Sequence, residues 1–200
     1  MTQPFEKDLK AAKAAARADA KARVRAISGA EFRAIGRAMA RYLTADPLLR
    51  QAPALFCFVS LCSEPDTRPI LEFALLHHKA LYLPRMRPHG EMDAVPVENF
   101  SALRPNAYGI LEPGESLTGT ASPAALCGMG ALAVLPCLAA GRDGTRLGRG
   151  GGYYDRFLAE FTGESVLLCP NALLYPTLPT GPLDVRPRRL LTESGFVPPA

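Results

Sequence analysis

The chain has 200 residues, of which 48% are hydrophobic and 21% charged, and its formal net charge is +4. This is an ordinary globular composition. No apolar run approaches the roughly 20 residues that span a bilayer, which excludes a membrane-spanning class. The basic N-terminus has no apolar core typical of a secretory signal. It also has acidic residues and no serine before Ser28, unlike a transit peptide, so we expect a cytoplasmic protein.

Cysteine and histidine usage gives no sign of a metal site. The five cysteines are Cys57, Cys62, Cys127, Cys137 and Cys169. They form no C-x-x-C pair, their number is odd, and most lie in apolar stretches, so we expect buried free thiols rather than a zinc site or a disulfide framework. The histidines His77, His78 and His89 have neither metal-ligand spacing nor paired acids.

Positive charge is concentrated near the N-terminus, with ten basic and three acidic residues between Lys7 and Arg41. Residues 7–25 are rich in Ala, Lys and Arg, which predicts a helix. A second helix is predicted from Ser28, where Ser28 and Glu31 can form a capping box. Its predicted buried face is Phe32, Ile35, Met39 and Leu43. The charge suits a nucleotide, nucleic acid or polyglutamate, and it equally suits a solvated helix face.

Short β-rich apolar runs alternate with helical segments along the rest of the chain. The predicted strands are 55–60, 81–83, 93–97, 131–135, 165–169 and a short one at 190–192. The predicted helices are 67–78 and 153–161. Residues 99–130, 136–152 and most of the tail from Pro170 are expected loops. Pro84 is expected to close the second strand, and the third is expected to be exposed.

This alternation predicts an α/β layered fold, with a mixed or mostly parallel sheet flanked by helices. We expect one compact domain over residues 1–200, with a basic helical segment over about residues 7–45.

The most informative stretch is Gly144-Thr-Arg-Leu-Gly-Arg-Gly-Gly-Gly-Tyr-Tyr-Asp155, between a predicted strand and a predicted helix. Glycines let the backbone approach a phosphate, and free N–H groups with a helix N-terminus attract anions. Arg146 and Arg149 add forked donors that suit phosphate oxygens. The loop is neither a Walker A motif nor a Rossmann fingerprint. A flexible surface turn is the alternative, but the flanking arginines and tyrosines favour phosphate binding.

Two roles are open for Asp155, which follows the glycines. It can be a first-turn carboxylate stabilised by the helix dipole. It can also be a Mg²⁺ ligand, because Mg²⁺ beside phosphates takes one or two carboxylates plus phosphate oxygens. A single aspartate does not decide between them. Asp184, in the C-terminal loops, is the best candidate for a second carboxylate.

The segment from Arg146 to Arg156 resembles the signature of the 5-formyltetrahydrofolate cyclo-ligase family. Weaker matches follow in family order at Lys13-Ala-Ala-Ala-Arg17, 60–67, 83–85, 108–113 and 178–193. The resemblance therefore covers nearly the whole chain, from about Lys13 to Gly195. The chain departs from the family's usual residues at Cys137, Ala140, Gly141 and Leu173, none of which is a candidate phosphate or metal ligand.

The resemblance implies an ATP- and Mg²⁺-dependent enzyme that cyclises 5-formyltetrahydrofolate to 5,10-methenyltetrahydrofolate and releases ADP and phosphate. It implies ATP contacts from Lys13, Arg17, Arg146, Leu147, Gly148, Arg149, Gly150, Gly151, Gly152, Tyr153 and Tyr154. It implies folate contacts from Val59, Glu64, Arg149 and Tyr153. Asp155 and Asp184 would be the metal-linked carboxylates, and Arg149 the catalytic residue.

Two other functions stay open. One is a divergent family member that binds ATP without folate turnover. The other is a nucleic-acid-binding module that uses the basic N-terminal helices, although no known nucleic-acid motif is present. We expect small-molecule partners only, namely 5-formyltetrahydrofolate and ATP, with no nucleic acid and no membrane, and a monomeric protein.

Overall fold

A seven-stranded sheet forms the centre of the computed structural model, which describes residues 3–107 and 109–198. Its strands, in chain order, are β1 (Ala54–Phe56), β2 (Ala80–Met86), β3 (Met92–Pro96), β6 (Leu132–Leu135), β9 (Ser165–Leu168), β11 (Arg189–Thr192) and β12 (Gly195–Val197). In space they are ordered β12-β11-β9-β6-β1-β2-β3. The five inner strands are parallel, and the two edge strands are antiparallel to their neighbours.

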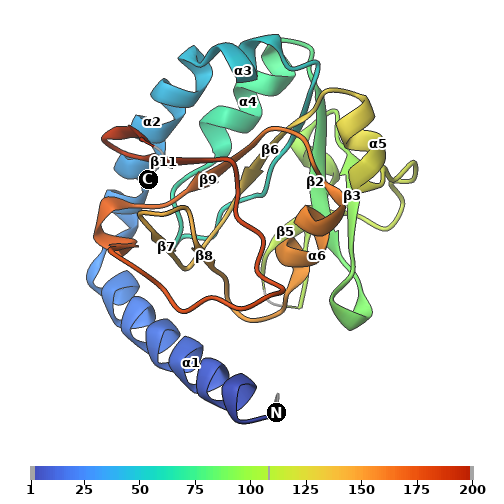
Figure 1. Ribbon diagram of the computed structural model, residues 1–200. Coiled ribbons are helices and arrows are strands. Elements are labelled where there is room, and N and C mark those ends of the chain that lie inside the picture. The colour runs from blue at the N-terminus through green and yellow to red at the C-terminus, as the bar shows by residue number, and fades with distance from the viewer. Residues whose placement is uncertain (1–2, 108, 199–200) are drawn as a thin grey trace.

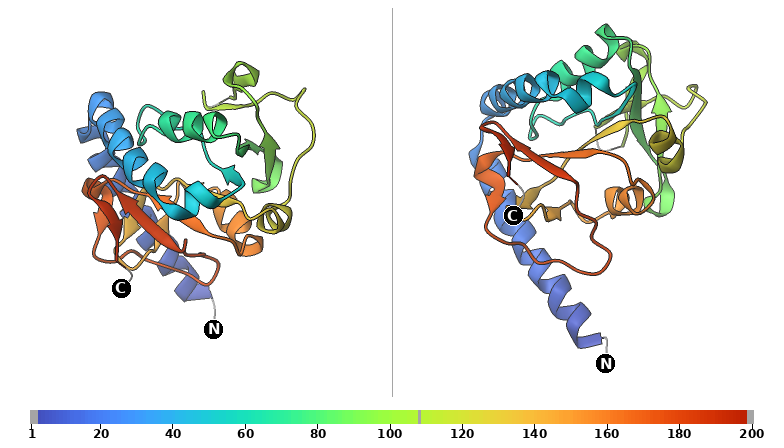
Figure 2. Two further views of the ribbon diagram at one scale, coloured as in Figure 1. Left: turned by 90° about the horizontal axis from the view of Figure 1, so that it is seen from above. Right: turned by 45° about the horizontal axis from the view of Figure 1, so that its top comes forward.

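Helices cover both faces of this sheet (Figures 1 and 2). They are α1 (Gln3–Ala26), α2 (Gly29–Ala45), α3 (Pro47–Gln51), α4 (Arg68–Leu76), α5 (Pro123–Gly128) and α6 (Tyr153–Glu160). Residues of α2, α3 and α4 share one buried cluster, and residues of α5 and α6 share another. The predicted α/β fold with a mostly parallel sheet is confirmed.

The pleat of the inner strands explains why both clusters are apolar. Successive strand residues point to opposite faces. In β9, Val166 and Leu168 join the α2–α4 cluster, whereas Leu167 joins the α5–α6 cluster. Phe56 of β1 stacks on Phe157 of α6 with ring centroids 4.4 Å apart. Strands buried on both faces are apolar at nearly every position, which is why these segments show no alternation in the sequence.

The start of α2 is the most accurately predicted boundary. The Ser28 hydroxyl accepts a hydrogen bond from Glu31 N at 3.2 Å, and the Glu31 carboxylate accepts one from Ser28 N at 2.7 Å. This is the predicted capping box. Phe32, Met39 and Leu43 are buried as expected, while the fourth predicted residue, Ile35, is partly buried.

The first strand is shorter than predicted. The prediction of a strand over residues 55–60 rested on their apolar character, which reflects burial and not pairing with a neighbouring strand. The strand ends at Phe56, although the chain stays buried through Phe58. Beyond it, the Thr67 hydroxyl donates to Phe58 O at 2.8 Å and accepts from Ser60 N at 3.1 Å. The buried Thr67 side chain thus provides hydrogen bonds to this segment that a neighbouring strand would otherwise provide.

The prediction that Pro84 closes the second strand is wrong. β2 continues to Met86, with Pro84 opposite Ala94 of β3. β2 pairs with β1 only as far as Tyr82. The missing N–H of Pro84 therefore removes no hydrogen bond between β2 and β1. β3 is an edge strand, but it is not simply exposed as expected, because Ala94 and Val95 are buried.

The predicted loops contain short elements. Residues 99–130 hold η2 (Phe100–Ala102), β4 (Leu103–Pro105), β5 (Leu111–Pro113) and α5, and η1 (Pro88–Gly90) precedes them. Residues 136–152 hold β7 (Ala139–Gly141) and β8 (Arg146–Leu147), and the tail adds η3 (Asn171–Leu173), β10 (Leu174–Tyr175) and β12. Strands of two or three residues are too short to show a hydrophobic period, so the sequence did not reveal them.

The expectation of buried thiols is only partly correct. All five cysteines are free, but only Cys57 and Cys169 are fully buried. Cys62 is exposed, because it lies in the turn that follows the shortened first strand.

Helix α1 is 24 residues long, and its N-terminal half extends beyond the sheet (Figures 1 and 2). Its C-terminal half is anchored by Ala20, which is completely buried against Leu138, Ala139 and Leu147. These contacts lie on β7, β8 and the turn before them, so the helix is fixed to the segment that leads into the glycine-rich loop. Within residues 3–107 and 109–198, no helix has the length and hydrophobicity needed to cross a membrane.

Gly36 lets α2 approach the Asp66 backbone, which gives a test of this packing. A Cβ at Gly36 would overlap Asp66 N and O. We expect Gly36→Ala to lower the free energy of unfolding by about 1–3 kcal/mol, despite the better helix propensity of alanine. Urea denaturation measures this. Gly128→Ala is the control, because a Cβ there meets nothing within 4 Å. Equal stability of the two variants would contradict the close contact.

The ion pair between Asp46 and Arg189 predicts a pH-dependent part of the stability. Asp46 accepts hydrogen bonds from Arg189 Nη1 at 3.0 Å and Nη2 at 2.6 Å, and from Leu48 N at 2.9 Å. The hydrogen bonds from Arg189 lower the pKa of Asp46 below its ordinary 3.8. A lowered folded-state pKa contributes stability that is complete above the unfolded pKa and is lost as the pH falls through the folded one.

We therefore expect Asp46→Asn, which can still cap α3, to cost roughly 1.5–3 kcal/mol at pH 7. The difference from the wild type should shrink below about pH 4, because the unfolded carboxyl then takes up a proton while the folded one stays ionised down to its lower pKa. Urea denaturation at several pH values measures this. A difference that stays constant down to the acid limit would contradict the role of the charge.

Candidate active site

The glycine-rich loop lies at the topological switch point of the sheet. From β1 the chain proceeds to β2 on one side, and then returns to β6 on the other side of β1. The segment with Glu64 follows the carboxyl end of β1, and the segment with the glycines follows that of β6, by way of β7 and β8. Ligands of open α/β sheets bind in the crevice at such a point.

An ion pair closes the loop. Arg146 of β8 places Nη2 2.7 Å from Asp155 Oδ1, in the first turn of α6, and their side chains are 4% and 24% exposed. Within the loop, Gly150 has φ +109° and Gly152 has φ +71°. L side chains rarely adopt these conformations, so glycine is needed at both positions. The backbone between Arg146 and Asp155 is therefore held in a tight loop at the start of α6.

Helix α1 binds both this loop and the C-terminal segment. Arg17 Nε donates to Gly148 O at 3.0 Å. One turn earlier, Lys13 Nζ donates to Asp184 Oδ1 at 2.6 Å, and Asp184 Oδ2 accepts a hydrogen bond from Gly181 N at 2.7 Å. Three segments that are far apart in the sequence thus meet at the candidate phosphate site.

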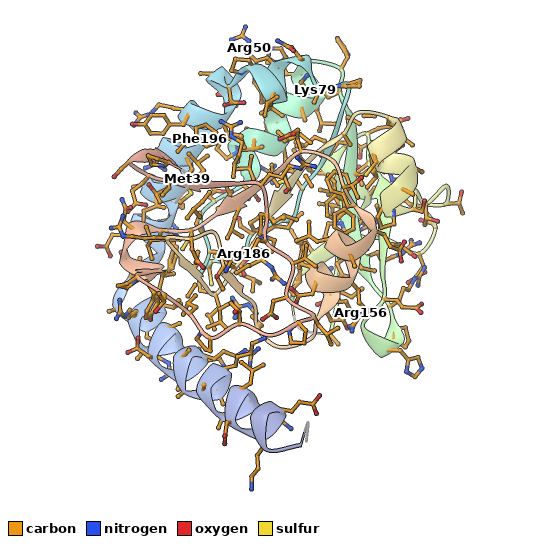
Figure 3. All side chains as sticks on the ribbon, viewed as in Figure 1. Met39, Arg50, Lys79, Arg156, Arg186 and Phe196 are labelled. Carbon is orange, nitrogen blue, oxygen red and sulfur yellow. The ribbon has the colours of Figure 1, made fainter. Side chains whose placement is uncertain are left out.

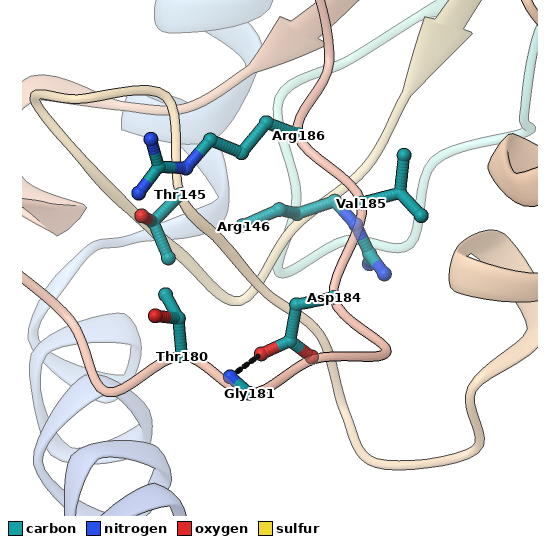
Figure 4. Close-up of a pocket in the computed structure, with 7 residues that line it drawn as sticks. All are labelled: Thr145, Arg146, Thr180, Gly181, Asp184, Val185 and Arg186. Carbon is teal, nitrogen blue, oxygen red and sulfur yellow. Dashed lines mark hydrogen bonds between the residues drawn. The ribbon is translucent and has the colours of Figure 1, made fainter.

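A cavity of about 250 Å³ lies between the β8 segment and the C-terminal segment (Figure 4). It is lined by Thr145, Arg146, Thr180, Gly181, Asp184, Val185 and Arg186. Figure 4 shows Thr180, Gly181 and Asp184 facing Thr145 across it. Two arginines and one carboxylate line the cavity, which favours an anionic ligand.

Sequence reasoning missed several of these lining residues. Thr180 and Gly181 lie in the segment 178–184, which the sequence predicts to be functional through Asp184. Their position next to Asp184 is the one feature of the sequence that points to them. Arg186 lies near the centre of the face seen in Figure 3, and its Nη2 is 2.8 Å from Asp143 Oδ2. No pattern in the sequence distinguishes Arg186 from the other arginines of the tail.

Two of the four predicted folate residues, Glu64 and Arg149, are in direct contact, whereas Val59 and Tyr153 contact other parts of the chain. Arg149 Nη2 donates to Glu64 Oε1 at 3.0 Å, and Glu64 Oε2 accepts from Leu61 N at 3.0 Å. Val59 is partly buried against the α2–α4 cluster. The Tyr153 hydroxyl lies 3.5 Å from Arg87 O. Glu64 and Arg149 are 85 positions apart, so the fold brings together two residues that the resemblance had assigned to one ligand.

Tyr154 lies between these two regions. Burial raises the pKa of the Tyr154 hydroxyl well above its ordinary value, and the nearby Glu64 carboxylate raises it further. The Arg146 guanidinium lies 5.8 Å from the centre of the Tyr154 ring. The hydroxyl therefore stays protonated at neutral pH and can act as a hydrogen-bond donor.

The two candidate metal carboxylates each have a basic partner, Arg146 for Asp155 and Lys13 for Asp184. The part of the chain that the structure describes holds no cluster of three or more His, Cys, Asp or Glu that could bind a metal by itself. Asp155 Oδ1 is nevertheless enclosed and lacks a well-aligned hydrogen-bond donor, despite its 2.7 Å contact with Arg146. A hard carboxylate oxygen of this kind fits Mg²⁺ when phosphate oxygens and water complete the coordination.

A parallel sheet with a glycine-rich loop at its switch point, contacted by a basic helix, is typical of an α/β nucleotide-binding enzyme. Residues 9–193 match the model of the 5-formyltetrahydrofolate cyclo-ligase family. The chain belongs to this family.

The chain is similar to several curated proteins named 5-formyltetrahydrofolate cyclo-ligase, two of which show how much of each chain is shared. The protein from Mus musculus is 28% identical over 196 residues, which cover 92% of this chain and 95% of the relative. The mitochondrial protein from Arabidopsis thaliana is 30% identical over 181 residues, which cover 76% of this chain but 63% of the relative. The chain thus spans nearly the full length of the mouse relative and less than two thirds of the plant one.

Solved structures show the same fold. The 5,10-methenyltetrahydrofolate synthetase of Aquifex aeolicus superposes with a TM-score of 0.79 at 25% identity, covering 92% of this chain and 91% of the other. A 5,10-methenyltetrahydrofolate synthetase from Mycoplasma pneumoniae gives a TM-score of 0.68 at 20% identity, covering 90% and 98%. At that identity, the second similarity supports the fold alone.

The Lys13–Asp184 pair predicts how firmly α1 is docked. We expect Asp184→Asn to speed amide hydrogen exchange in the Lys13–Arg17 turn roughly fivefold, as a loss of about 1 kcal/mol implies, because the amide can still accept from Gly181 N but no longer pairs with Lys13. Glu72→Gln is the control, because it breaks an exposed ion pair with Arg68 on α4. Unchanged exchange in α1 would show that the pair does not hold the helix.

Proposed function

We propose that the protein is an ATP- and Mg²⁺-dependent enzyme that cyclises 5-formyltetrahydrofolate to 5,10-methenyltetrahydrofolate, with release of ADP and phosphate. Family membership and a structural neighbour described as a methenyltetrahydrofolate synthetase support this activity. The observation that carries the proposal is the meeting of Arg17, the glycine-rich loop and the Glu64–Arg149 pair at one switch point. It supports the proposal because the candidate phosphate-binding loop is then directly beside the candidate folate-binding carboxylate.

ATP is proposed to bind across the loop, with its phosphates on the backbone N–H groups of residues 147–154. Arg146 lines the adjoining cavity and Arg17 contacts the loop from α1, so both can neutralise phosphate charge. Lys13 would add a third positive charge from the same helix. Asp155 and Asp184 are the residues that would hold Mg²⁺, directly or through water. The ion would neutralise and orient the phosphates when bound.

The chemistry asked of the protein is mainly positioning. The γ-phosphoryl group would pass to the formyl oxygen of the folate, which turns that oxygen into a phosphate leaving group. N10 of the folate would then attack the activated carbon and close the five-membered ring as phosphate leaves. No protein nucleophile is needed, so orientation and charge neutralisation supply the rate enhancement.

The Glu64–Arg149 contact gives these two residues a coupled role. In the structure, the Arg149 guanidinium binds the Glu64 carboxylate. Hydrogen bonds from the N–H edge of the pterin to Glu64 would replace that contact. Arg149 would then be released toward the phosphoryl group, so that folate binding completes the site for ATP. Tyr153 and Val59 are proposed to line the same folate site.

The remaining properties follow the same proposal. We infer a monomeric, cytoplasmic protein that forms one α/β domain over residues 1–200 and takes only small-molecule substrates. The basic residues of α1 favour small-molecule substrates over nucleic acid, because Lys13 and Arg17 contact the candidate site rather than forming a free nucleic-acid surface.

Direct turnover tests the proposal. Purified protein is mixed with ATP, Mg²⁺ and 5-formyltetrahydrofolate, and the absorbance of methenyltetrahydrofolate is followed together with ADP. We expect the two products in equal amounts, and no methenyltetrahydrofolate when ATP is omitted. A folded protein that binds ATP without forming product would instead be a family member without folate turnover. Strongly salt-dependent binding to RNA or DNA without turnover would favour the nucleic-acid function.

Arg149 provides the sharpest test within the site. We expect Arg149→Ala to lower kcat by about 10²–10³ while the fold is retained, because the side chain is half exposed and supplies charge rather than packing. Steady-state kinetics and circular dichroism measure the two effects. Arg23→Ala is the matched control, because Arg23 is similarly exposed and has an ion pair of 3.1 Å with Asp19. A folded Arg149→Ala variant with nearly wild-type kcat would remove this residue from the mechanism.

A further inference from the structure

Two cysteines lie side by side beneath the candidate ATP site. Strands β6 and β9 are parallel neighbours, with Leu135 opposite Leu167. Cys137 and Cys169 each lie two residues further along their own chain segment, just past the last paired residues, and extending the register would place them opposite each other. Both belong to the α5–α6 side of the core, and neither is oxidised.

Several contacts bring the two thiols within reach. The Cys137 thiol donates to Leu168 O at 3.3 Å, and Leu168 is the residue directly before Cys169. The Cys169 thiol donates to Pro170 O at 3.5 Å and to Leu173 O at 3.4 Å, on the same side of the core. Neighbouring strands lie about 4.7–4.9 Å apart, and a disulfide needs a Cα separation of about 4.4–6.8 Å. A disulfide between these two cysteines is therefore compatible with the spacing of adjacent strands and with the contact of the Cys137 thiol with Leu168 O.

We propose that Cys137 and Cys169 are a site of reversible oxidation, at which a peroxide converts them into an intramolecular disulfide. A peroxide oxidises the Cys137 thiol to a sulfenic acid, with release of one water. The Cys169 sulfur then attacks the sulfenic sulfur, the S–S bond forms, and a second water leaves with the Cys169 proton. Two thiols are oxidised and one peroxide is reduced to two waters, so the step is balanced.

The order of events follows from burial. Cys137 is partly exposed, whereas Cys169 is fully buried. Burial raises the pKa of the Cys169 thiol well above its usual value, and the neighbouring Cys137 thiol raises it further. Cys169 is therefore inert toward solution oxidants by itself. It acts only as the resolving thiol for its neighbour.

The position of the pair connects the modification to the site. Directly after Cys137, Leu138 N donates to Leu147 O at 2.8 Å, next to the glycine-rich loop. After Cys169, the chain turns through η3 into β10, which pairs with β7. A disulfide would therefore fix the two segments that support the loop relative to each other.

Peroxide treatment of the folded Cys62→Ala protein tests the proposal. Cys62 is replaced because its thiol is exposed and would react with peroxide itself. We expect the intact mass to fall by two hydrogen atoms and a digest to contain a linked peptide pair with residues 137 and 169. Dithiothreitol should reverse both changes. Cys137→Ala should prevent the link and leave Cys169 reduced, whereas the control Cys127→Ala should form it normally.

Circular dichroism establishes that each variant is folded. If both thiols stay reduced in the folded protein, or if Cys137 is oxidised to a sulfinic acid without joining Cys169, the proposal is wrong. A link between Cys169 and a different cysteine would equally overturn it. These readouts are masses and peptides, so they do not depend on whether the enzyme turns over folate.

Discussion

The Arg146–Asp155 ion pair is the interaction on which the candidate site depends. The Arg146 guanidinium cannot lose its charge in a protein and is almost fully buried, so it needs a carboxylate beside it. The nearest one is on the first turn of α6, on the far side of the glycines. Satisfying this charge draws β8 and α6 together and forces the intervening residues into a tight loop, which only glycines at Gly150 and Gly152 can follow without strain.

The rest of the site is assembled around this loop by longer connections. Helix α1 binds it through Arg17, and binds the C-terminal segment through Lys13 and Asp184. From the opposite side, Glu64 reaches Arg149 at the tip of the loop. Each of these segments follows the carboxyl end of a parallel strand or, in the case of α1, packs against β7 and β8. The order of the strands is therefore what turns separate motifs into one site.

The sequence predicted the parts of the molecule whose physics is local. The Ser28–Glu31 capping box, the apolar face of α2 and the helix after Tyr153 depend on neighbouring residues, and all three are confirmed. It did not predict features that depend on distant partners. After β1, the Thr67 hydroxyl bonds to residues seven and nine positions earlier, and Pro84 is tolerated because β1 has already ended.

The same distinction applies to the candidate site. Its residue types and the loop could be found from the sequence, because glycines, arginines and a following helix are a local pattern. The ion pairs that hold them, Arg146 with Asp155, Lys13 with Asp184 and Arg149 with Glu64, could not be paired in advance. Arg186 could not be found at all, because a lone arginine in a loop carries no pattern.

The central claim is that three distant segments build one nucleotide site. Amide hydrogen exchange with and without Mg²⁺–ATP, in the absence of folate, tests this claim most directly. The account predicts that ATP slows exchange in the glycine-rich loop, around Lys13 and Arg17 in α1, and in the turn from Gly181 to Asp184, while exchange in α2 and α4 is unaffected. Protection confined to one of these segments, or found only elsewhere in the chain, would contradict it.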